Sequence, residues 1–143
     1  ITLDDPETVE GPFEGADIGW SQNLKDDIVV KFQNEKGEYL VLLLDPEREE
    51  VVLDRRHSGK TDFHESFADK IHALPYYPKN MYSDIRIVMD QASIEVFIDG
   101  GRYVMTEKFF PNEAFTSLRL TSSSGTVIRD FTIKSVANTW NNE

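Results

Sequence analysis

The chain has 143 residues, 39% of them hydrophobic and 11% aromatic, which is enough for one domain with its own hydrophobic core. Its 26 acidic and 15 basic side chains give a formal net charge of −11, a field that repels phosphate backbones and anionic lipids, so we expect neither nucleic-acid nor membrane partners. The absence of cysteine excludes disulfides, thiolate metal ligands and thiol nucleophiles.

The first clear strand pattern runs from Ile28 to Gln33, where apolar residues fall on one parity; a turn composition follows. Glu38 to Asp45 is apolar on both parities, which predicts a central strand covered on both faces. After a charged loop around Pro46, Val51 to Arg56 predicts the returning strand.

The segment from Ser58 to Asn80 has the weakest periodicity. A helical turn around Glu65 to Ile71 fits the pattern, but Pro75 and Pro78 would end it, so we interpret the segment as an ordered connection rich in aromatic residues. Further strand patterns follow at Ile85 to Asp90, Ile94 to Asp99, Arg102 to Phe109, Ser117 to Thr121 and Val127 to Val136. Ten or so short strands predict an all-β fold, a two-sheet antiparallel β-sandwich spanning residues 1–143 as a single module.

Residues 85–98 read as a hairpin. If Gln91 and Ala92 form a two-residue loop, Asp90 faces Ser93 and the strands pair so that their side chains separate by polarity. One face then holds only apolar residues: Ile85, Ile87, Met89, Ile94, Val96 and Ile98. The other holds Arg86, Val88, Asp90, Ser93, Glu95 and Phe97. The next turn, at residues 99–101, has a composition more typical of hairpin turns. Its two glycines, however, leave the pairing register of the strand at Arg102 to Phe109 undetermined by one residue.

Glu95 is the residue of interest on the polar face. It has three interpretations. The first is a cross-strand ion pair with Arg86. The second is a polar sugar site, in which Asp90 and Glu95 accept hydrogen bonds from sugar hydroxyls, the arginine of this face donates and an aromatic ring lies beside them. The third is one half of a glycosidase acid–base pair with Asp90. The third is the weakest, because a catalytic acid needs an apolar pocket and a neighbouring arginine acts in the opposite direction.

Three segments carry a family resemblance: "VVLDRRHSG" (Val51 to Gly59), "DIRIVMDQASIEVFIDGG" (Asp84 to Gly101) and "YVMTEKFFP" (Tyr103 to Pro111). In order and spacing they resemble the C-terminal β-sandwich module of glycoside hydrolase family 32, the invertases, inulinases and levanases, and "IRDFTIKSVANTW" from Ile128 resembles its last strand. Arg56 replaces a usual serine, and Gln91-Ala92 replaces a usual arginine-serine. The resemblance implies a jelly-roll, concanavalin-like sandwich.

In this family the catalytic acidic residues belong to an N-terminal propeller. The Asp-Pro pairs here, Asp5-Pro6 and Asp45-Pro46, lack the family's motif context, and Arg129-Asp130 is followed by Phe131 rather than proline. The resemblance therefore implies a non-catalytic accessory module that stabilises and packs on the propeller of a fructan-hydrolysing or sucrose-hydrolysing enzyme. It also implies an extracellular or periplasmic location and, in some members, dimer contacts through the parent enzyme. A start at Ile1, without a signal-peptide pattern, suggests a processed chain or a piece of a longer one.

Carbohydrate binding is the competing function. A related group of modules binds the terminal fructose of levan, and the resemblance implies Asp54, Arg55, Asp90 and Glu95 as the contacts here. Tyr76, Tyr77 and Tyr82 are candidates for an aromatic wall, although edge packing also accounts for them.

Two negative expectations complete the prediction. His57, His64 and His72 lack ligand spacing, so we expect no metal site and no cofactor. Trp20, Phe109, Phe110 and Trp140 are interface candidates, but core packing is the more common role of such residues.

Overall fold

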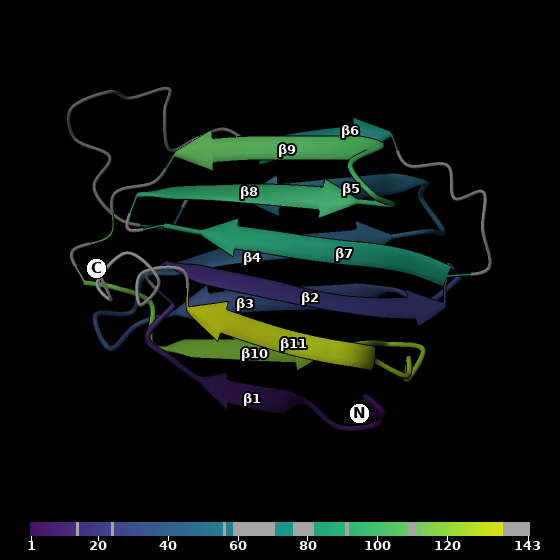
Figure 1. Cartoon of the computed structure of the whole chain (residues 1–143), viewed down its shortest axis with the longest axis horizontal. Helices are drawn as coiled ribbons and strands as arrows, with labels where there is room; N and C mark the ends of the chain where they lie inside the picture. Colours follow the sequence, from purple (N-terminus) through teal and green to yellow (C-terminus); the bar gives the residue numbers. More distant parts are fainter. Residues whose placement is uncertain are drawn as a thin grey trace.

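A computed structural model describes residues 1–13, 15–23, 25–55, 57–58, 71–75, 82–90, 92–108, 111 and 113–135. Within these residues, eleven strands form two antiparallel sheets stacked face to face (Figure 1). The six-stranded sheet contains, in spatial order, β1 (Glu7–Glu10), β10 (Ser117–Thr121), β3 (Ile28–Gln33), β4 (Tyr39–Asp45), β5 (Glu50–Asp54) and β6 (Ile71–Pro75). The five-stranded sheet contains β11 (Arg129–Ser135), β2 (Ala16–Asn23), β7 (Tyr82–Met89), β8 (Ser93–Ile98) and β9 (Tyr103–Lys108).

The predicted two-sheet antiparallel sandwich is confirmed, and three strands were missed. β1 and β2 precede the first strand predicted from sequence, and β6 lies inside the segment interpreted as a connection. Ile71, the end of the suggested helical turn, begins β6, while the rest of that turn lies outside the described residues. No helix in the described ranges is both long and apolar enough to cross a membrane.

The core lies between the sheets and consists of side chains on one parity of each strand. In β4 the buried positions are Leu40, Leu42 and Leu44, whereas Val41 and Leu43 are only half-buried on the outer face. β4 is therefore an interior strand, as predicted, but it is fully covered on one face and not on both. Its apolar outer face leaves an aliphatic surface on the six-stranded sheet.

β2 follows the same alternation and carries one polar group into the core. Trp20 is 4% exposed and its ring stacks on Phe131 at 6.3 Å between centroids. The indole Nε1 donates a hydrogen bond of 2.8 Å to Oε1 of the fully buried Gln22, whose Nε2 donates to the Asp26 carbonyl. Trp20 is thus a core residue, and Gln22 is buried because its polar atoms have partners.

The β7–β8 hairpin has the predicted register. Met89 faces Ile94, Val88 faces Glu95 and Ile87 faces Val96, while the Asp90 N–H donates to the Ser93 carbonyl across the loop at 2.9 Å. All six residues predicted for the inner face are buried.

The next turn resolves the register that the sequence left open. Asp99, Gly100 and Gly101 all have positive φ, at 56°, 68° and 91°, a run that glycine permits at little cost. The turn sets Tyr103 opposite Ile98 and Val104 opposite Phe97. Met105 consequently points inward and is buried.

Candidate functional site

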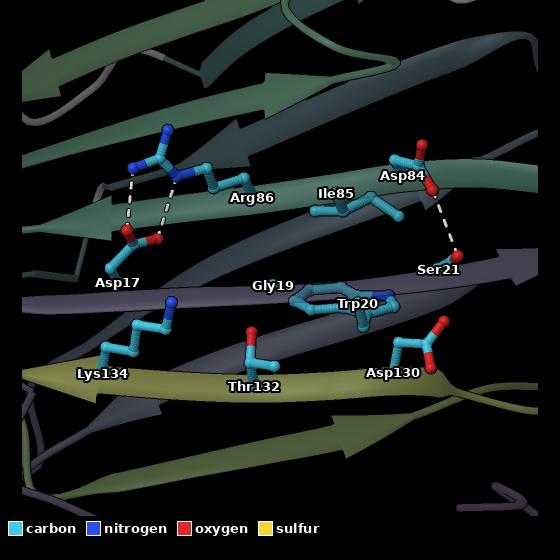
Figure 2. Close-up of a pocket in the computed structure, with 10 residues that line it drawn as sticks. All are labelled: Asp17, Gly19, Trp20, Ser21, Asp84, Ile85, Arg86, Asp130, Thr132 and Lys134. Carbon is cyan, nitrogen blue, oxygen red and sulfur yellow. Dashed lines mark hydrogen bonds and ion pairs between the residues drawn. The ribbon is translucent and has the colours of Figure 1, made fainter.

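A polar depression of about 450 Å³ lies on the outer face of the five-stranded sheet, over β11, β2 and β7 (Figure 2). Because side chains alternate along a strand, every second residue of these three strands faces this surface. The lining residues are Asp17, Gly19, Trp20, Ser21, Asp84, Ile85, Arg86, Asp130, Thr132 and Lys134.

Gly19 forms the floor of the depression. It lies in register with Arg86 on β7 and Thr132 on β11, so the two larger side chains stand on either side of a position with none. A Cβ atom at Gly19 would lie 3.4 Å from Thr132 Oγ1 and 3.6 Å from the Ile85 carbonyl oxygen. The space above Gly19 therefore exists because this outward position carries no side chain.

An ion pair forms one wall. Arg86 donates through Nε to Asp17 Oδ1 at 3.0 Å and through Nη2 to Asp17 Oδ2 at 2.7 Å, the two-point geometry typical of strong arginine–carboxylate pairs (Figure 2). The hydrogen bond from Arg86 lowers the pKa of the Asp17 carboxyl despite some desolvation, and the charges of Arg86 and Lys134 lower it further. Asp17 raises the pKa of Arg86 in turn. Asp17 is therefore ionised at neutral pH.

The opposite end is shaped by a bulge in β11. Arg129 faces Ser21 while Thr132 faces Gly19, so β11 has one extra residue in this interval. The extra residue is associated with Asp130, whose φ is 54°, a left-handed conformation that aspartate tolerates better than most residues. Because of the bulge, the side chains of two successive residues, Arg129 and Asp130, lie on the outer face of the five-stranded sheet.

An aromatic ring stands beside this end. The Arg129 guanidinium lies 4.9 Å from the centroid of the Tyr82 ring, and Tyr82 is 40% exposed. Ser21 Oγ donates to Asp84 Oδ1 at 3.1 Å nearby. This end of the depression therefore combines an exposed ring with hydroxyl and carboxylate groups.

A second depression of about 340 Å³ adjoins the first and is lined by Asp84, Ile85, Arg86, Phe97, Gly100 and Gly101. Asp84, Ile85 and Arg86 on β7 line both, so the two depressions adjoin at this strand, and we call the pair, which extends over β11, β2, β7 and β8, the groove. The Arg86 guanidinium carbon lies 5.8 Å from the centroid of the Phe97 ring. Arg86 is therefore held between a carboxylate on β2 and an aromatic ring on β8.

The groove is nearly neutral although the chain is strongly acidic. Three lining carboxylates, Asp17, Asp84 and Asp130, stand against Arg86 and Lys134, which leaves a net charge of −1 on a chain of −11. Across the described ranges, no group of three or more His, Cys, Asp and Glu side chains is arranged to hold a metal ion. The groove offers hydrogen-bond donors and acceptors to a polar ligand.

The residues predicted from sequence for sugar contact do not share one pocket. Arg55 is 7% exposed and lies between the sheets, where Nη1 is 3.1 Å from Glu107 Oε2 and donates to the Lys108 carbonyl at 2.7 Å. Asp54, the preceding residue, is half-buried on the outer face of the six-stranded sheet. The two neighbours thus point in different directions.

Asp90 and Glu95 are both exposed and belong to the outer face of the five-stranded sheet, Glu95 between Val88 and Thr106. Tyr82 begins β7 and Asp90 follows its end, about 26 Å away along an extended strand. Tyr82 and Asp90 therefore cannot contact one sugar ring. Tyr76 and Tyr77 lie outside the described residues, as do Phe109, Phe110 and Trp140.

The ion pair predicted between Arg86 and Glu95 does not form. Arg86 forms its ion pair with Asp17, and Glu95 adds only a minor electrostatic contribution. Sequence reasoning missed the groove because it did not assign β2. The signal was present, since Ala16, Ile18 and Trp20 alternate with Asp17, Gly19 and Ser21 in the pattern of a half-buried strand.

The fold and the groove define a β-sandwich module with a polar outer face. Comparison with known families makes this specific: residues 15–136 match the family described as "Glycosyl hydrolases family 32 C terminal", and the chain belongs to this family. It is 35% identical over 97 residues to an extracellular exo-inulinase of Aspergillus awamori, covering 66% of this chain and 18% of that protein.

A second relative and a solved structure agree. A levanase of Bacillus sp. (strain L7) is 35% identical over 77 residues, covering 54% of this chain and 8% of the levanase. The crystal structure of the Aspergillus awamori exo-inulinase superposes with a TM-score of 0.69 at 24% identity, covering 92% of this chain and 28% of the other. The aligned residues thus make up less than a fifth of the length of these two curated relatives.

Proposed function

We propose that this chain is the non-catalytic C-terminal accessory module of a glycosidase that acts on β-fructofuranosides, of the levanase, inulinase or invertase type. The observation that carries the proposal is the family match over residues 15–136. The names of the similar proteins, an exo-inulinase and a levanase, support a fructan as the substrate of the longer protein. The name of the exo-inulinase, which includes the word extracellular, supports an exported enzyme.

The absence of family catalytic motifs supports a non-catalytic role. Neither Asp5-Pro6 nor Asp45-Pro46 has the expected motif context. Glu95, the carboxylate considered for acid–base chemistry, is exposed on a sheet face, where it lacks the apolar enclosure that such chemistry requires. The catalytic residues of the parent enzyme would then belong to another domain.

An aliphatic surface supports packing against that domain. Val29, Leu43 and Val52 are directly paired across β3, β4 and β5 and are half-buried on the outer face of the six-stranded sheet, and Val41 lies beside them on β4. Contiguous apolar patches on a sheet face commonly mark interaction sites. We propose that the catalytic propeller of the same protein covers this row. Homodimerisation through the parent enzyme stays an expectation, measurable by light scattering on the full-length protein.

The test compares the 143-residue chain with the full-length protein. We expect the full-length protein to release fructose from levan, inulin or sucrose and the isolated chain to release none from any of them. Leu43→Asp in the full-length protein should lower its melting temperature more than it lowers that of the isolated chain, because the aspartate would be fully buried only where the propeller covers it. Fructose release by the isolated chain would refute the accessory role.

A second candidate function is recognition of a terminal fructose by the motif residues. It is favoured by one observation: Asp90 and Glu95 are exposed on the same face of the hairpin, where carboxylates can accept hydroxyl hydrogen bonds. Asp54 and Arg55 belong to the same prediction, although they point elsewhere. Calorimetric titration with levan, inulin and fructose tests it: if these residues are the site, Glu95→Ala abolishes binding without a large change in melting temperature, and unchanged binding by Glu95→Ala refutes this second candidate.

A further inference from the structure

We propose that the groove over Gly19 binds a run of a neutral oligosaccharide, at a site separate from the motif residues Asp54, Arg55, Asp90 and Glu95. The groove itself is argued from geometry and charge. The choice of a fructan as its ligand rests on the proposed function, because only the relationship to fructan-degrading enzymes selects that sugar.

The shape of the groove suits a chain of sugar units. Its two depressions, of about 450 and 340 Å³, each fall within the usual size range of small-molecule sites. They adjoin at β7, where Asp84, Ile85 and Arg86 line both, so a ligand that lies across these residues would contact both depressions. Because the two depressions together extend over β11, β2, β7 and β8, their elongated arrangement suits several sugar units in a row.

The charges favour a neutral ligand. Arg86 and Asp17 neutralise each other in a two-point ion pair, and the positive charge of Lys134 also stabilises the ionised form of the same carboxylate. The overall charge of −11 disfavours an anionic ligand, while the groove's own net charge of −1 gives little attraction for a cation. A neutral ligand with many hydroxyl groups needs hydrogen-bond partners rather than electrostatic attraction.

The groove supplies those partners in fixed positions. The Arg86 guanidinium is 60% exposed and carries N–H donors beyond the two that bond Asp17. The Asp84 carboxylate, which accepts one hydrogen bond from Ser21, has further lone pairs for ligand hydroxyls. Because the ion pair and this hydrogen bond hold both groups before a ligand arrives, little side-chain entropy would be lost on binding.

Two aromatic rings add apolar surface, one in the groove and one beside it. The half-buried Phe97 ring lines the second depression. The exposed Tyr82 ring, held by Arg129, stands on β7 two residues before Asp84 on the same face. Aromatic rings combined with a few placed polar groups are typical of ligand sites, and they match sugar rings, which present both C–H faces and hydroxyl edges.

Two variants test the groove, each with a matched control. Arg86→Ala removes the central donor, and Gly19→Leu fills the floor with a side chain that points outward from the sheet. The controls introduce the same two residues, alanine and leucine, at Arg119, an exposed arginine of β10 on the six-stranded sheet. Circular dichroism and melting curves verify that each variant is folded.

The measurement is isothermal titration of the 143-residue chain with levan-type and inulin-type fructo-oligosaccharides, and with xylo-oligosaccharides as a non-fructan probe. We expect a dissociation constant in the range of about 1 mM to 1 μM for a fructo-oligosaccharide. Arg86→Ala should weaken binding by about tenfold or more, a difference of about 1.4 kcal/mol, and Gly19→Leu should abolish it. Both Arg119 variants should bind within about twofold of the parent chain.

The remaining outcomes overturn the proposal. No response to either fructo-oligosaccharide contradicts it, as does binding that survives both groove variants, or binding lost in Glu95→Ala but kept in Arg86→Ala. Xylo-oligosaccharide binding in place of fructan binding contradicts the choice of ligand. Failure here is distinguishable from failure of the proposed function, because fructose release by the full-length protein is measured separately.

Discussion

The molecule contains two arginine–carboxylate pairs in contrasting environments. Arg55 and Glu107 connect the two sheets, with 3.1 Å between Nη1 and Oε2 and side chains that are 8% and 17% exposed. Arg86 and Asp17 lie on an outer face, with 2.7 Å between Nη2 and Oδ2 and side chains that are 60% and 22% exposed. The sequence predicted sugar contact for Arg55, and for Arg86 it left two interpretations, an ion pair with Glu95 or a donor to sugar hydroxyls. Burial gives each arginine a different role.

The difference teaches that position relative to the sheets determines what a charged pair does. Removing one partner of a buried pair is costly because the other charge stays in a poorly solvated site. Breaking an exposed pair costs little, since water and salt replace it. Arg55 therefore acts as a link between the sheets, while Arg86 has the exposure that ligand contact requires.

The largest predicted effect is on stability. Arg55→Ala should lower the free energy of unfolding by about 3 kcal/mol, because it removes both the ion pair to Glu107 and the hydrogen bond to the Lys108 carbonyl. Urea denaturation of the isolated chain measures the loss, with the exposed Arg119→Ala as control. A loss below about 1 kcal/mol would remove the distinction between the two arginines.

An intermediate case is Asp27, a half-buried carboxylate held by hydrogen bonds rather than by an ion pair. Its Oδ1 accepts from the Ser123 hydroxyl at 2.8 Å and the Ser124 hydroxyl at 2.9 Å, and the Ser123 and Ser124 N–H groups also donate to the carboxylate. Asp27→Asn should cost about 1 kcal/mol at neutral pH, as measured by urea denaturation. Glu35→Gln, at an exposed residue of the β3–β4 turn, is the control.

The same variant predicts a pH dependence. Burial raises the pKa of the Asp27 carboxyl, but the hydrogen bonds from Ser123 and Ser124 outweigh burial and leave its pKa below the ordinary value of 3.8. The stabilisation is therefore complete above about pH 3.8 and is lost as the pH falls through the lower folded-state pKa. The difference in the free energy of unfolding between the parent chain and Asp27→Asn should become smaller in that acidic range. A difference that does not change with pH would contradict the role of the ionised carboxylate.

A smaller stability effect is predicted at the exposed pair. Arg86→Ala should cost at most about 1 kcal/mol, and less at high salt. Arg86 holds the pKa of Asp17 below 3.8, so this contribution too is present above about pH 3.8 and fades as the pH falls through the folded-state pKa. Melting curves at low and high ionic strength measure it. A stability loss equal to that of Arg55→Ala would contradict the comparison.

The smallest effect is expected at Glu95. Glu95→Gln should change the free energy of unfolding by less than about 0.5 kcal/mol, because the side chain is exposed and the ion pair of Arg86 is formed with Asp17. Thermal unfolding of the two proteins in the same buffer provides the measurement. A loss above 1 kcal/mol would show that the cross-strand attraction to Arg86 is a main stabilising contact.

Much of the fold could be predicted from the alternation of apolar and polar residues in the sequence, but the site could not. The β7–β8 register was predictable because apolar residues separate completely onto one face. The inward direction of Arg55 was also predictable, since it continues the parity of Val51 and Leu53. The groove depends on β2 pairing with both β7 and β11, contacts between residues far apart in the chain. Local pattern alone cannot bring Gly19 between Arg86 and Thr132.

The central claim is that the groove over Gly19, rather than the hairpin around Glu95, contacts the saccharide. Backbone amide chemical shifts of the isotope-labelled chain, followed during titration with levan-type and inulin-type oligosaccharides, test it most directly. We predict that the largest shifts map to Gly19, Arg86 and Thr132. Shifts concentrated at Asp90 and Glu95, or no shifts with any fructan, would contradict the claim.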